Sequence, residues 1–360
     1  MLPSISKLLP AIPTMSLGHG AAPGNHSMRS KLEAAARNHF VGIELFHPCL
    51  QAFAEEFEGE TERDRLRAAA KGTKQIADEV GLKIICLQPL LHYDGLVDEQ
   101  EHRDRLDEAV FRFELCGILG CDMIQVPATW RLDDGVTGDE EKIVKEFREL
   151  SDLGLKNNPP IRFAYEPMCW STYAYTWQKA YNIVRKVDRP NFGIVLDTFQ
   201  VAGYEYADPT LPDCVRPNRR ERLAASLAEL SKTVDLSKVL YLQIVDAERI
   251  EPPLLPLGAP STKPEELRKT VSPYHVDGQQ PRMSWSRNCR LFPCEEELGG
   301  FMPIDEVYRA FLELGTGFEG YVSFELFTRH MNNPDKSLPE MHAQRGWRSW
   351  EAIHRKLGMM

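Results

Sequence analysis

The chain contains the runs FAYE (163–166), IVLD (194–197), VLYLQ (239–243) and YVSFE (321–325), and each ends on a carboxylate or an amide. Such a group at the end of a buried strand is costly unless it has a partner. One occurrence is an accident, whereas four suggest that the side chains converge on one cation. Oxygen ligands suit Mg²⁺, Mn²⁺ or a similar hard ion. We therefore predict a metal site made of Glu166, Asp197, Gln243 and Glu325.

Short apolar runs alternate with longer charged segments along the whole chain. The pattern predicts strands over 11–17, 41–46, 82–88, 122–127, 161–166, 192–197, 239–245 and 321–325. It predicts helices over 28–38, 62–80, 101–118, 139–155, 174–187, 218–233, 303–314 and 340–356. Over 62–80 the apolar residues form one stripe, and Gly81 follows where a left-handed residue ends a helix. Eight β/α units in order favour a (β/α)8 TIM barrel, a single domain over 1–360, rather than an open doubly wound sheet.

One long segment interrupts this alternation. Residues 247–302 form an insertion after the seventh predicted strand and are rich in Pro, Glu and Arg. The loops that follow the strands of a barrel surround its active site. We therefore expect the insertion to cover the site.

Composition and charge limit the classes of function. The 360 residues are 42% hydrophobic and carry a formal net charge of −10, which argues against nucleic-acid binding. A small anionic substrate held by a few arginines remains compatible with that charge. No apolar stretch reaches the length needed to span a membrane, and no signal peptide is evident. The eight cysteines form no C-x-x-C pair, which indicates a reducing compartment, the cytoplasm. The oligomeric state stays open, a homo-oligomer included.

The four predicted ligands would share one rim. Adjacent parallel strands lie about 5 Å apart, so four side chains at successive strand ends can reach one ion. Taken singly, each carboxylate could instead cap a helix or form a salt bridge. Without a cation they would repel one another, and at least one should take up a proton. Zinc is less favoured than Mg²⁺, Mn²⁺ or Co²⁺, because no nearby Cys or His completes a tetrahedral site.

Further motifs add a resemblance to a known family. They are GIELF (42–46), QP (88–89), YEP (165–167), LDTF (196–199), LQIVDA (242–247) and SFELF (323–327). With these motifs the chain resembles the xylose isomerase-like barrels, and within them the fungal 3-dehydroshikimate dehydratases of quinate catabolism. The resemblance covers nearly the whole chain, including RLFP (290–293) and GFEGY (317–321). It implies a metal-dependent lyase that converts 3-dehydroshikimate to protocatechuate, with Glu166, Asp197, Gln243 and Glu325 as the metal ligands.

The implied reaction needs a proton acceptor and a group that binds the substrate. The metal would polarise the ring ketone and stabilise the enolate left when the neighbouring proton departs. His92 and His47 each follow a predicted strand and could act as a base, or be ordinary loop histidines. We favour His92, with Glu166 and a water held by the metal as competitors. Bacterial relatives tend to carry a histidine at the position of Gln200.

Arginine would bind the carboxylate of the substrate, because its planar fork matches two oxygens. Arg290 is our first choice because it lies in the RLFP stretch. The other candidates are Arg287, Arg131, Arg282 and Arg249, and each could instead be solvated. Gln88 and Gln200 are candidates for hydrogen bonds to ring hydroxyls. The side chains of Trp130, Phe199 and Trp285 could wall the ring or simply pack in the core.

Three other functions compete with a dehydratase. A sugar isomerase or epimerase on the same barrel would use the same metal and enolate chemistry on a neutral substrate. An endonuclease for damaged DNA needs several histidine ligands and a basic face, which the sequence lacks. A barrel without activity would have little reason to keep four ligands.

Overall fold

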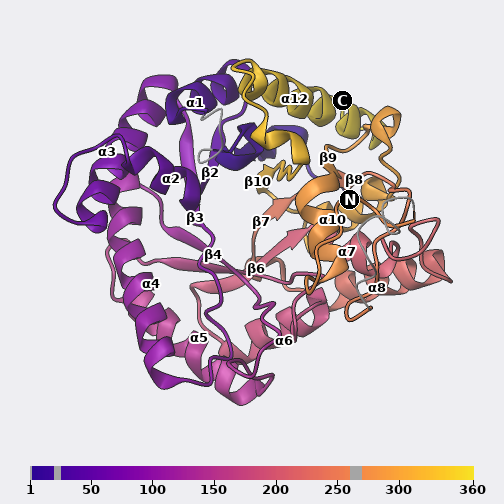
Figure 1. Cartoon of the computed structure of the whole chain (residues 1–360), viewed down its shortest axis with the longest axis horizontal. Helices are drawn as coiled ribbons and strands as arrows, with labels where there is room; N and C mark the ends of the chain where they lie inside the picture. Colours follow the sequence, from indigo (N-terminus) through magenta and orange to yellow (C-terminus); the bar gives the residue numbers. More distant parts are fainter. Residues whose placement is uncertain (1, 20–25, 260–269) are drawn as a thin grey trace.

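Eight parallel strands close into a barrel in the computed structural model, which describes residues 2–19, 26–259 and 270–360. The strand order around the barrel is β1-β10-β7-β6-β5-β4-β3-β2. The strands are β1 (Leu8–Pro13), β2 (Gly42–Phe46), β3 (Lys83–Gln88), β4 (Met123–Pro127), β5 (Arg162–Glu166), β6 (Phe192–Asp197), β7 (Val239–Gln243) and β10 (Gly320–Ser323). Figure 1 looks into this ring of strands, with the helices around it. The predicted TIM barrel is confirmed.

All eight predicted helices are present, and their ends lie within three residues of the prediction. They are α1 (Met28–Arg37), α3 (Glu62–Val80), α4 (Glu99–Leu119), α5 (Glu140–Leu155), α6 (Trp177–Val187), α8 (Arg219–Thr233), α11 (Ile304–Leu312) and α12 (Leu338–Lys356). Helix α3 begins with a capping box between Thr61 and Asp64 and ends at Gly81, whose φ of 77° is left-handed. Local signals at both ends therefore set its length.

The first and last predicted strands are wrong in their bounds. Strand β1 begins at Leu8, because Leu8 and Leu9 pair with the start of β10, and residues 14–17 form a 3-10 helix rather than strand. Strands β7 and β10 each end two residues earlier than predicted, at Gln243 and Ser323. Glu325 therefore lies just beyond its strand.

Two short helices were not predicted. Helix α2 (His47–Ala54) follows β2 directly, and α7 (Thr198–Glu205) follows β6 directly. Each has eight residues, and seven of the eight in α7 are buried, so neither shows the one-sided apolar stripe that identifies a surface helix. The segment before α7 is held by Asp197, whose carboxylate caps the helix through the Phe199 N–H.

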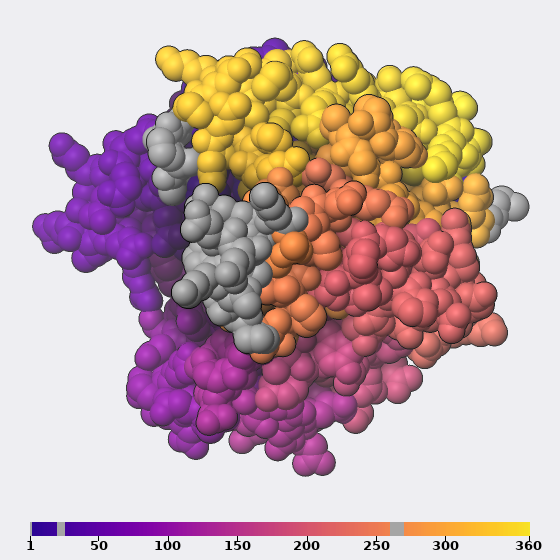
Figure 2. All heavy atoms as spheres, turned by 45° about the vertical axis from the view of Figure 1, so that its right-hand side comes forward, coloured from indigo at the N-terminus to yellow at the C-terminus, as the bar shows by residue number. Residues whose placement is uncertain are grey.

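The insertion predicted over 247–302 is ordered around a small hairpin; residues 260–269 lie outside the described part. Strand β8 (Asp246–Ala247) pairs antiparallel with β9 (Arg290–Leu291), and α10 (Pro281–Cys289) leads into β9. The N–H of Arg290 also donates to the carbonyl of Phe327 at 3.0 Å, beyond β10. The insertion thus returns to the C-terminal ends of β7 and β10. Figure 2 shows its orange atoms between the pink segments that precede it and the yellow C-terminal segments.

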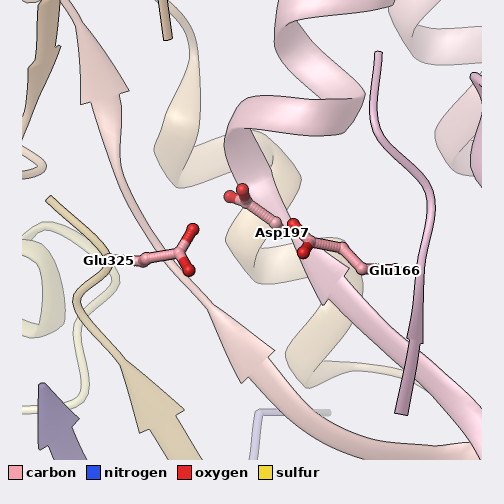
Figure 3. A group of neighbouring side chains, drawn as sticks. All are labelled: Glu166, Asp197 and Glu325. Carbon is pink, nitrogen blue, oxygen red and sulfur yellow. The ribbon is translucent and has the colours of Figure 1, made fainter. Parts of the chain in front are cut away.

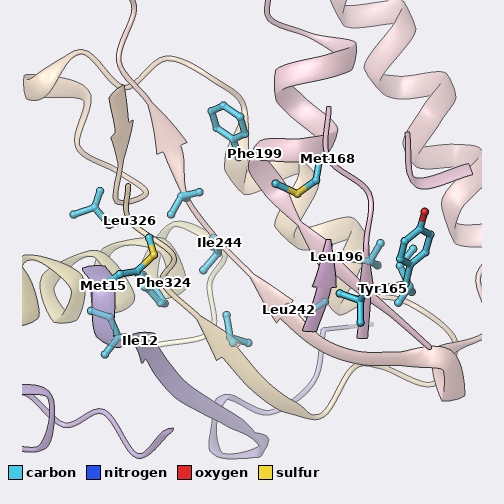
Figure 4. Packing of buried hydrophobic residues seen from close by; sticks show 14 of the residues in the cluster. Ile12, Met15, Tyr165, Met168, Leu196, Phe199, Leu242, Ile244, Phe324 and Leu326 are labelled. Atoms are coloured by element: carbon cyan, nitrogen blue, oxygen red, sulfur yellow. The ribbon is translucent and has the colours of Figure 1, made fainter. Parts of the chain in front are cut away.

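The core has two parts, because successive side chains on a strand point to opposite sides. Ala164, Val195 and Tyr241 point into the barrel, in a cluster with Ala11, Ile85, Cys86 and Met123. Tyr165, Leu196 and Leu242 point outward and pack in the larger core between strands and helices (Figure 4). Within the described residues, no helix is long and apolar enough to cross a membrane.

Candidate active site

The alternation along the strands places a set of polar side chains inside the barrel at its C-terminal end. Each lies two residues beyond an inward-pointing core residue, for example Glu166 beyond Ala164 and Asp197 beyond Val195. The remaining members of the set are Gln88, Gln125 and Gln243, and Glu44 points inward from the middle of β2. The period of two along a strand therefore brings the carboxylates and amides together.

Three of the four predicted ligands meet at one point. Oxygen atoms of Glu166, Asp197 and Glu325 all lie within 4.8 Å of one another, and all three residues are buried. Figure 3 shows the three carboxylates turned toward a common space from β5, β6 and the segment after β10. A buried acidic triad of this kind could hold a metal ion.

The fourth predicted ligand, Gln243, leaves one atom without a partner. Its amide nitrogen donates to Glu325 at 3.0 Å and to Glu44 at 3.0 Å, whereas its amide oxygen is buried and makes no hydrogen bond. A buried oxygen without a donor is costly. A cation would satisfy an oxygen of this kind, and three carboxylates with one amide oxygen are a donor set that fits a hard divalent ion.

Neighbouring groups hold the ligands in place. Glu166 accepts hydrogen bonds from Gln125 at 2.5 Å and from Gln200 at 3.2 Å. Asp197 accepts the Phe199 N–H at 2.8 Å, while its other oxygen makes no hydrogen bond. Partners that fix the orientation of metal ligands are a regular feature of metal sites.

Burial raises the pKa of every carboxyl in the set. Desolvation lifts the pKa of Glu166 well above its usual range, with the charges of Glu325 and Asp197 adding to the effect. Burial also raises the pKa of Asp197, and it raises that of Glu325 to about 8. In the absence of a cation at least one carboxyl therefore keeps its proton at neutral pH, in agreement with the sequence prediction. A bound divalent ion would favour the charged forms again.

Arg290 lies at the metal ligands rather than apart from them. Its Nη1 atom donates to Glu325 at 2.7 Å and lies 3.1 Å from the unbonded oxygen of Asp197. Its Nε atom donates to Ser286 at 2.9 Å, and its guanidinium stacks on the ring of Phe199. The side chain is almost completely buried. Arg290 is thus a fixed positive charge bound to the acidic triad.

Arg287, one turn earlier on α10, differs in every one of these respects. Within the described part of the chain it makes no ion pair, and its guanidinium lies 5.8 Å from the ring of Trp130. Burial lowers its pKa, and no carboxylate offsets that effect. Arg287 is exposed to solvent at the border of the site and therefore offers an unpaired fork for an anion.

Both arginines border one cavity of about 100 Å³, together with Glu166 and Glu325 of the acidic triad. Its polar lining comes from Gln88, Gln125, Glu166, Ser286, Arg287, Arg290 and Glu325. Its apolar walls are Phe46, Pro89, Leu91, Pro127, Trp130, Met168, Trp170 and Phe327. A mostly apolar cavity with a few converging polar groups is typical of a small-molecule site. The insertion supplies three of the lining residues, as expected for a segment that covers the site.

Several predicted site residues do not line this cavity. His92 has its Nδ1 atom 3.1 Å from the Thr129 hydroxyl, and its ring stacks against Trp130 at 4.4 Å. Burial lowers its pKa to about 4, so its imidazole is neutral at pH 7. Arg131 turns toward α4, where it forms ion pairs with Glu101 and Asp133.

The remaining predicted residues also lie outside the cavity. Gln200 lies behind Glu166, and its oxygen accepts the Cys169 N–H at 2.8 Å. His47 begins α2 and faces a surface groove with Glu108 and Arg112, where burial lowers its pKa to about 3. Of the three aromatic residues predicted as walls, only Trp130 lines the cavity.

The sequence analysis missed two polar residues of the site. Gln125 holds Glu166, and Glu44 accepts hydrogen bonds beneath the triad. Their signal was present in the sequence, since each is a single polar residue in an apolar strand, in MIQVP (123–127) and GIELF (42–46). A buried polar residue inside a strand needs a partner as much as one at its end.

The comparisons with known proteins agree with this architecture. The model of the xylose isomerase-like TIM barrel family matches residues 32–347, and the chain belongs to that family. Within it, the chain is 45% identical over 349 residues to the 3-dehydroshikimate dehydratase of Neurospora crassa, covering 95% of this chain and 92% of the relative.

More distant relatives share the fold. A 3-dehydroshikimate dehydratase of Pseudomonas putida is 25% identical over 304 residues, and the match spans only 36% of that longer protein. Among solved structures, the IOLI protein with a bound zinc atom superposes with a TM-score of 0.65 at 19% identity, covering 97% of this chain and 98% of that one.

Proposed function

We propose that this protein is a 3-dehydroshikimate dehydratase, a lyase that removes water from a cyclic keto acid and yields protocatechuate. The near full-length identity of 45% to the Neurospora crassa enzyme supports this function. The observation that carries it is one cavity lined both by Glu166 and Glu325, from an acidic triad that fits a divalent ion, and by Arg287, which makes no ion pair within the described residues. The substrate has a ketone and hydroxyl for the ion and a carboxylate for the arginine.

We infer that Glu166, Asp197, Gln243 and Glu325 hold Mg²⁺ or Mn²⁺, with Co²⁺ as a third candidate. When bound, such an ion polarises a ketone and stabilises the negative charge of an enolate. The oxygen-only donor set favours these hard ions over zinc.

We assign the substrate carboxylate to Arg287 rather than to Arg290, our first choice from the sequence. Arg290 already donates to Glu325, so an incoming carboxylate would have to compete with a buried ion pair. Arg287 lines the same cavity and makes no ion pair within the described residues. A substrate carboxylate beside Arg287 would pair with its guanidinium through two charge-assisted hydrogen bonds. Arg290 would then keep the ligand carboxylates in place.

Two groups are candidates for the proton acceptor, as the sequence suggested. Glu166 borders the cavity, and its raised pKa makes its ionised form, which a bound cation would favour, a better proton acceptor. His92 is unprotonated at pH 7, as a base must be, but it lies behind Trp130. Gln88 lines the cavity and stays a candidate for a hydrogen bond to a ring hydroxyl, whereas Gln200 braces Glu166.

The test is an ultraviolet assay for protocatechuate. The purified protein is stripped with EDTA and then given 3-dehydroshikimate, with and without Mg²⁺ or Mn²⁺. We expect the aromatic product to appear only with a metal ion. A folded protein that binds Mn²⁺ but yields no product would refute the dehydratase and turn attention to sugar isomerisation or epimerisation.

We also infer that the protein works in a reducing compartment such as the cytoplasm. All eight cysteines are free thiols, and seven of them are buried. Free buried thiols are typical of proteins that are not exposed to oxidising conditions.

A further inference from the structure

Glu44 is a buried carboxylate that the proposed reaction does not use. It lies in the middle of β2, points into the barrel and has no solvent exposure. Within the described residues no arginine or lysine forms an ion pair with it. Its partners are neutral donors: the Tyr241 hydroxyl at 2.9 Å, the Gln88 amide at 3.0 Å and the Gln243 amide at 3.0 Å. A buried carboxylate is costly, so its place beneath the triad calls for a physical reason.

The hydrogen bonds of Gln243 supply that reason. Its amide group has a nitrogen end, which donates hydrogen bonds, and an oxygen end, which accepts them. The nitrogen lies between the carboxylates of Glu44 and Glu325, both of which are acceptors. If the amide were turned over, its oxygen would face the acceptor oxygens of Glu44 and Glu325, and both hydrogen bonds of the nitrogen would be lost. In the observed orientation the oxygen lies at the other end of the amide group and has no hydrogen-bond partner.

We propose that Glu44 is a positioning residue for the metal centre: it locks the amide of Gln243 so that the oxygen, rather than the nitrogen, is presented to the cation. This inference rests on the metal site of the proposed function. Glu325 is itself one of the proposed ligands, so its carboxylate would be shared between the amide nitrogen and a cation. Glu44 lies one layer deeper, so it holds the nitrogen whether or not a cation is bound.

Gln88 follows the same logic on the neighbouring strand. Its amide nitrogen donates to Glu44 at 3.0 Å and to Glu325 at 3.2 Å. Glu44 thus anchors two amides that both lead to Glu325. Outer partners of this kind, when substituted, typically cost 10- to 100-fold in metal affinity.

The test is Mn²⁺ binding to the EDTA-stripped full chain, measured by calorimetry, in the wild type and in Glu44→Gln. The substitution keeps the shape but replaces one acceptor oxygen with a donor, so the amide of Gln243 can turn over. We expect Mn²⁺ affinity to fall by about 10- to 100-fold, with thermal stability of the metal-free protein retained. Cys86→Ala is the matched control, since it removes a donor to Glu44 (Cys86 Sγ at 3.8 Å) and leaves the acceptors of the Gln243 amide in place. Its Mn²⁺ affinity should stay close to that of the wild type.

The same substitution in a Gln243→Glu variant separates the loss of amide orientation from a general disturbance of the metal site. In Gln243→Glu the ligand has two equivalent oxygens and nothing to orient, and it faces Glu44 with a like charge. Adding Glu44→Gln to this variant should leave Mn²⁺ affinity unchanged or raise it. An equal loss in both backgrounds would overturn the proposal, and so would wild-type affinity in Glu44→Gln alone. If Glu44→Gln does not fold, Glu44→Asp, which withdraws the carboxylate, is measured in the same two backgrounds.

The outcome is separable from the dehydratase assay. In one outcome the wild type binds Mn²⁺, Glu44→Gln binds it more weakly, and the wild type makes no protocatechuate. This result would refute the dehydratase and retain the role of Glu44. A wild-type protein that binds no Mn²⁺ would overturn the metal site and the role of Glu44 together.

Discussion

Replacing Arg290 should make the stability of this protein depend on metal. Arg290→Met keeps a long apolar side chain but removes the guanidinium. The acidic triad then loses the Nη1 atom that lies 2.7 Å from a Glu325 oxygen and 3.1 Å from an Asp197 oxygen. Breaking a buried ion pair by removing one partner costs about 3–5 kcal/mol, because the other charge stays buried.

The lower end of that range applies here. Burial raises the pKa of Glu325 to about 8, so without a cation most of this carboxyl is already protonated at pH 7. Losing Arg290 would raise the pKa further and complete that protonation, which limits the loss. With an entropy of unfolding of about 2.1 cal/mol/K per residue, a loss of about 3 kcal/mol in a chain of 360 residues lowers Tm by about 4 °C.

The assay is thermal unfolding at pH 7, with EDTA and with saturating Mn²⁺. We expect Tm of Arg290→Met to lie about 4 °C below that of the wild type in EDTA. The difference in Tm between the two proteins should be smaller with Mn²⁺, because the ion supplies the missing positive charge. Two matched controls sharpen the test. Arg287→Met removes a cation without an ion pair and should leave Tm unchanged or raise it. Arg131→Met breaks surface ion pairs worth about 1 kcal/mol or less.

Two results would refute this reasoning. If Tm of Arg290→Met in EDTA equalled that of the wild type, Arg290 would not be neutralising the triad. If Tm fell equally in EDTA and Mn²⁺, the loss would come from packing against Phe199 and not from charge.

Four further predictions test other parts of the site. Glu325→Ala should abolish protocatechuate formation and Mn²⁺ binding while circular dichroism shows a retained fold; full activity would remove the metal site. Arg287→Met should raise KM about 10- to 100-fold with little change in kcat, since a hydrogen bond to a charged group is worth about 1.5–3 kcal/mol; an unchanged KM would move carboxylate binding elsewhere. If His92 accepts the proton, His92→Asn should lower kcat at constant KM. Because the pKa of His92 is about 4, kcat of the wild type should then fall on the acid side near pH 4 rather than 6.5. Unchanged kinetics in His92→Asn would leave Glu166 as the acceptor. Burial raises the folded-state pKa of Asp246 to about 7, so the contribution of this carboxyl to stability is full below about pH 4 and is lost as pH rises through 7. Asp246→Asn should therefore be more stable than the wild type at pH 8 but not at pH 4. If the free energies of unfolding of the two proteins changed in parallel with pH, the assignment would be contradicted.

Much of the barrel could be read from local pattern. Helix α3 has a stripe, a capping box and a terminal glycine, and its predicted bounds are those observed. Helix α7 has none of these signals and was missed, because it is short and buried on nearly all sides. The start of β1 was misplaced because its register depends on pairing with β10 at the other end of the chain.

The candidate metal ligands were accessible from the sequence for the same reason. Glu166, Asp197 and Gln243 each end an apolar strand, and parallel strands end at one rim, so chain order alone implies that they meet. Glu325 was also found, although its strand ends earlier than predicted.

The sequence by itself therefore determined the barrel and brought the acidic triad to one rim, because strand period, strand order and the cost of burying polar groups are local or topological properties. Only the tertiary structure decided how the surrounding charges divide their roles. Arg287 and Arg290 lie three residues apart on the same segment, and nothing local distinguishes them. One is bound to the triad and the other is free, because α10 and β9 fold back over the barrel at one particular angle. Hydrogen-bond partners such as Glu44 and Gln243 come from strands far apart in the chain, so their pairing exists only once the barrel has closed.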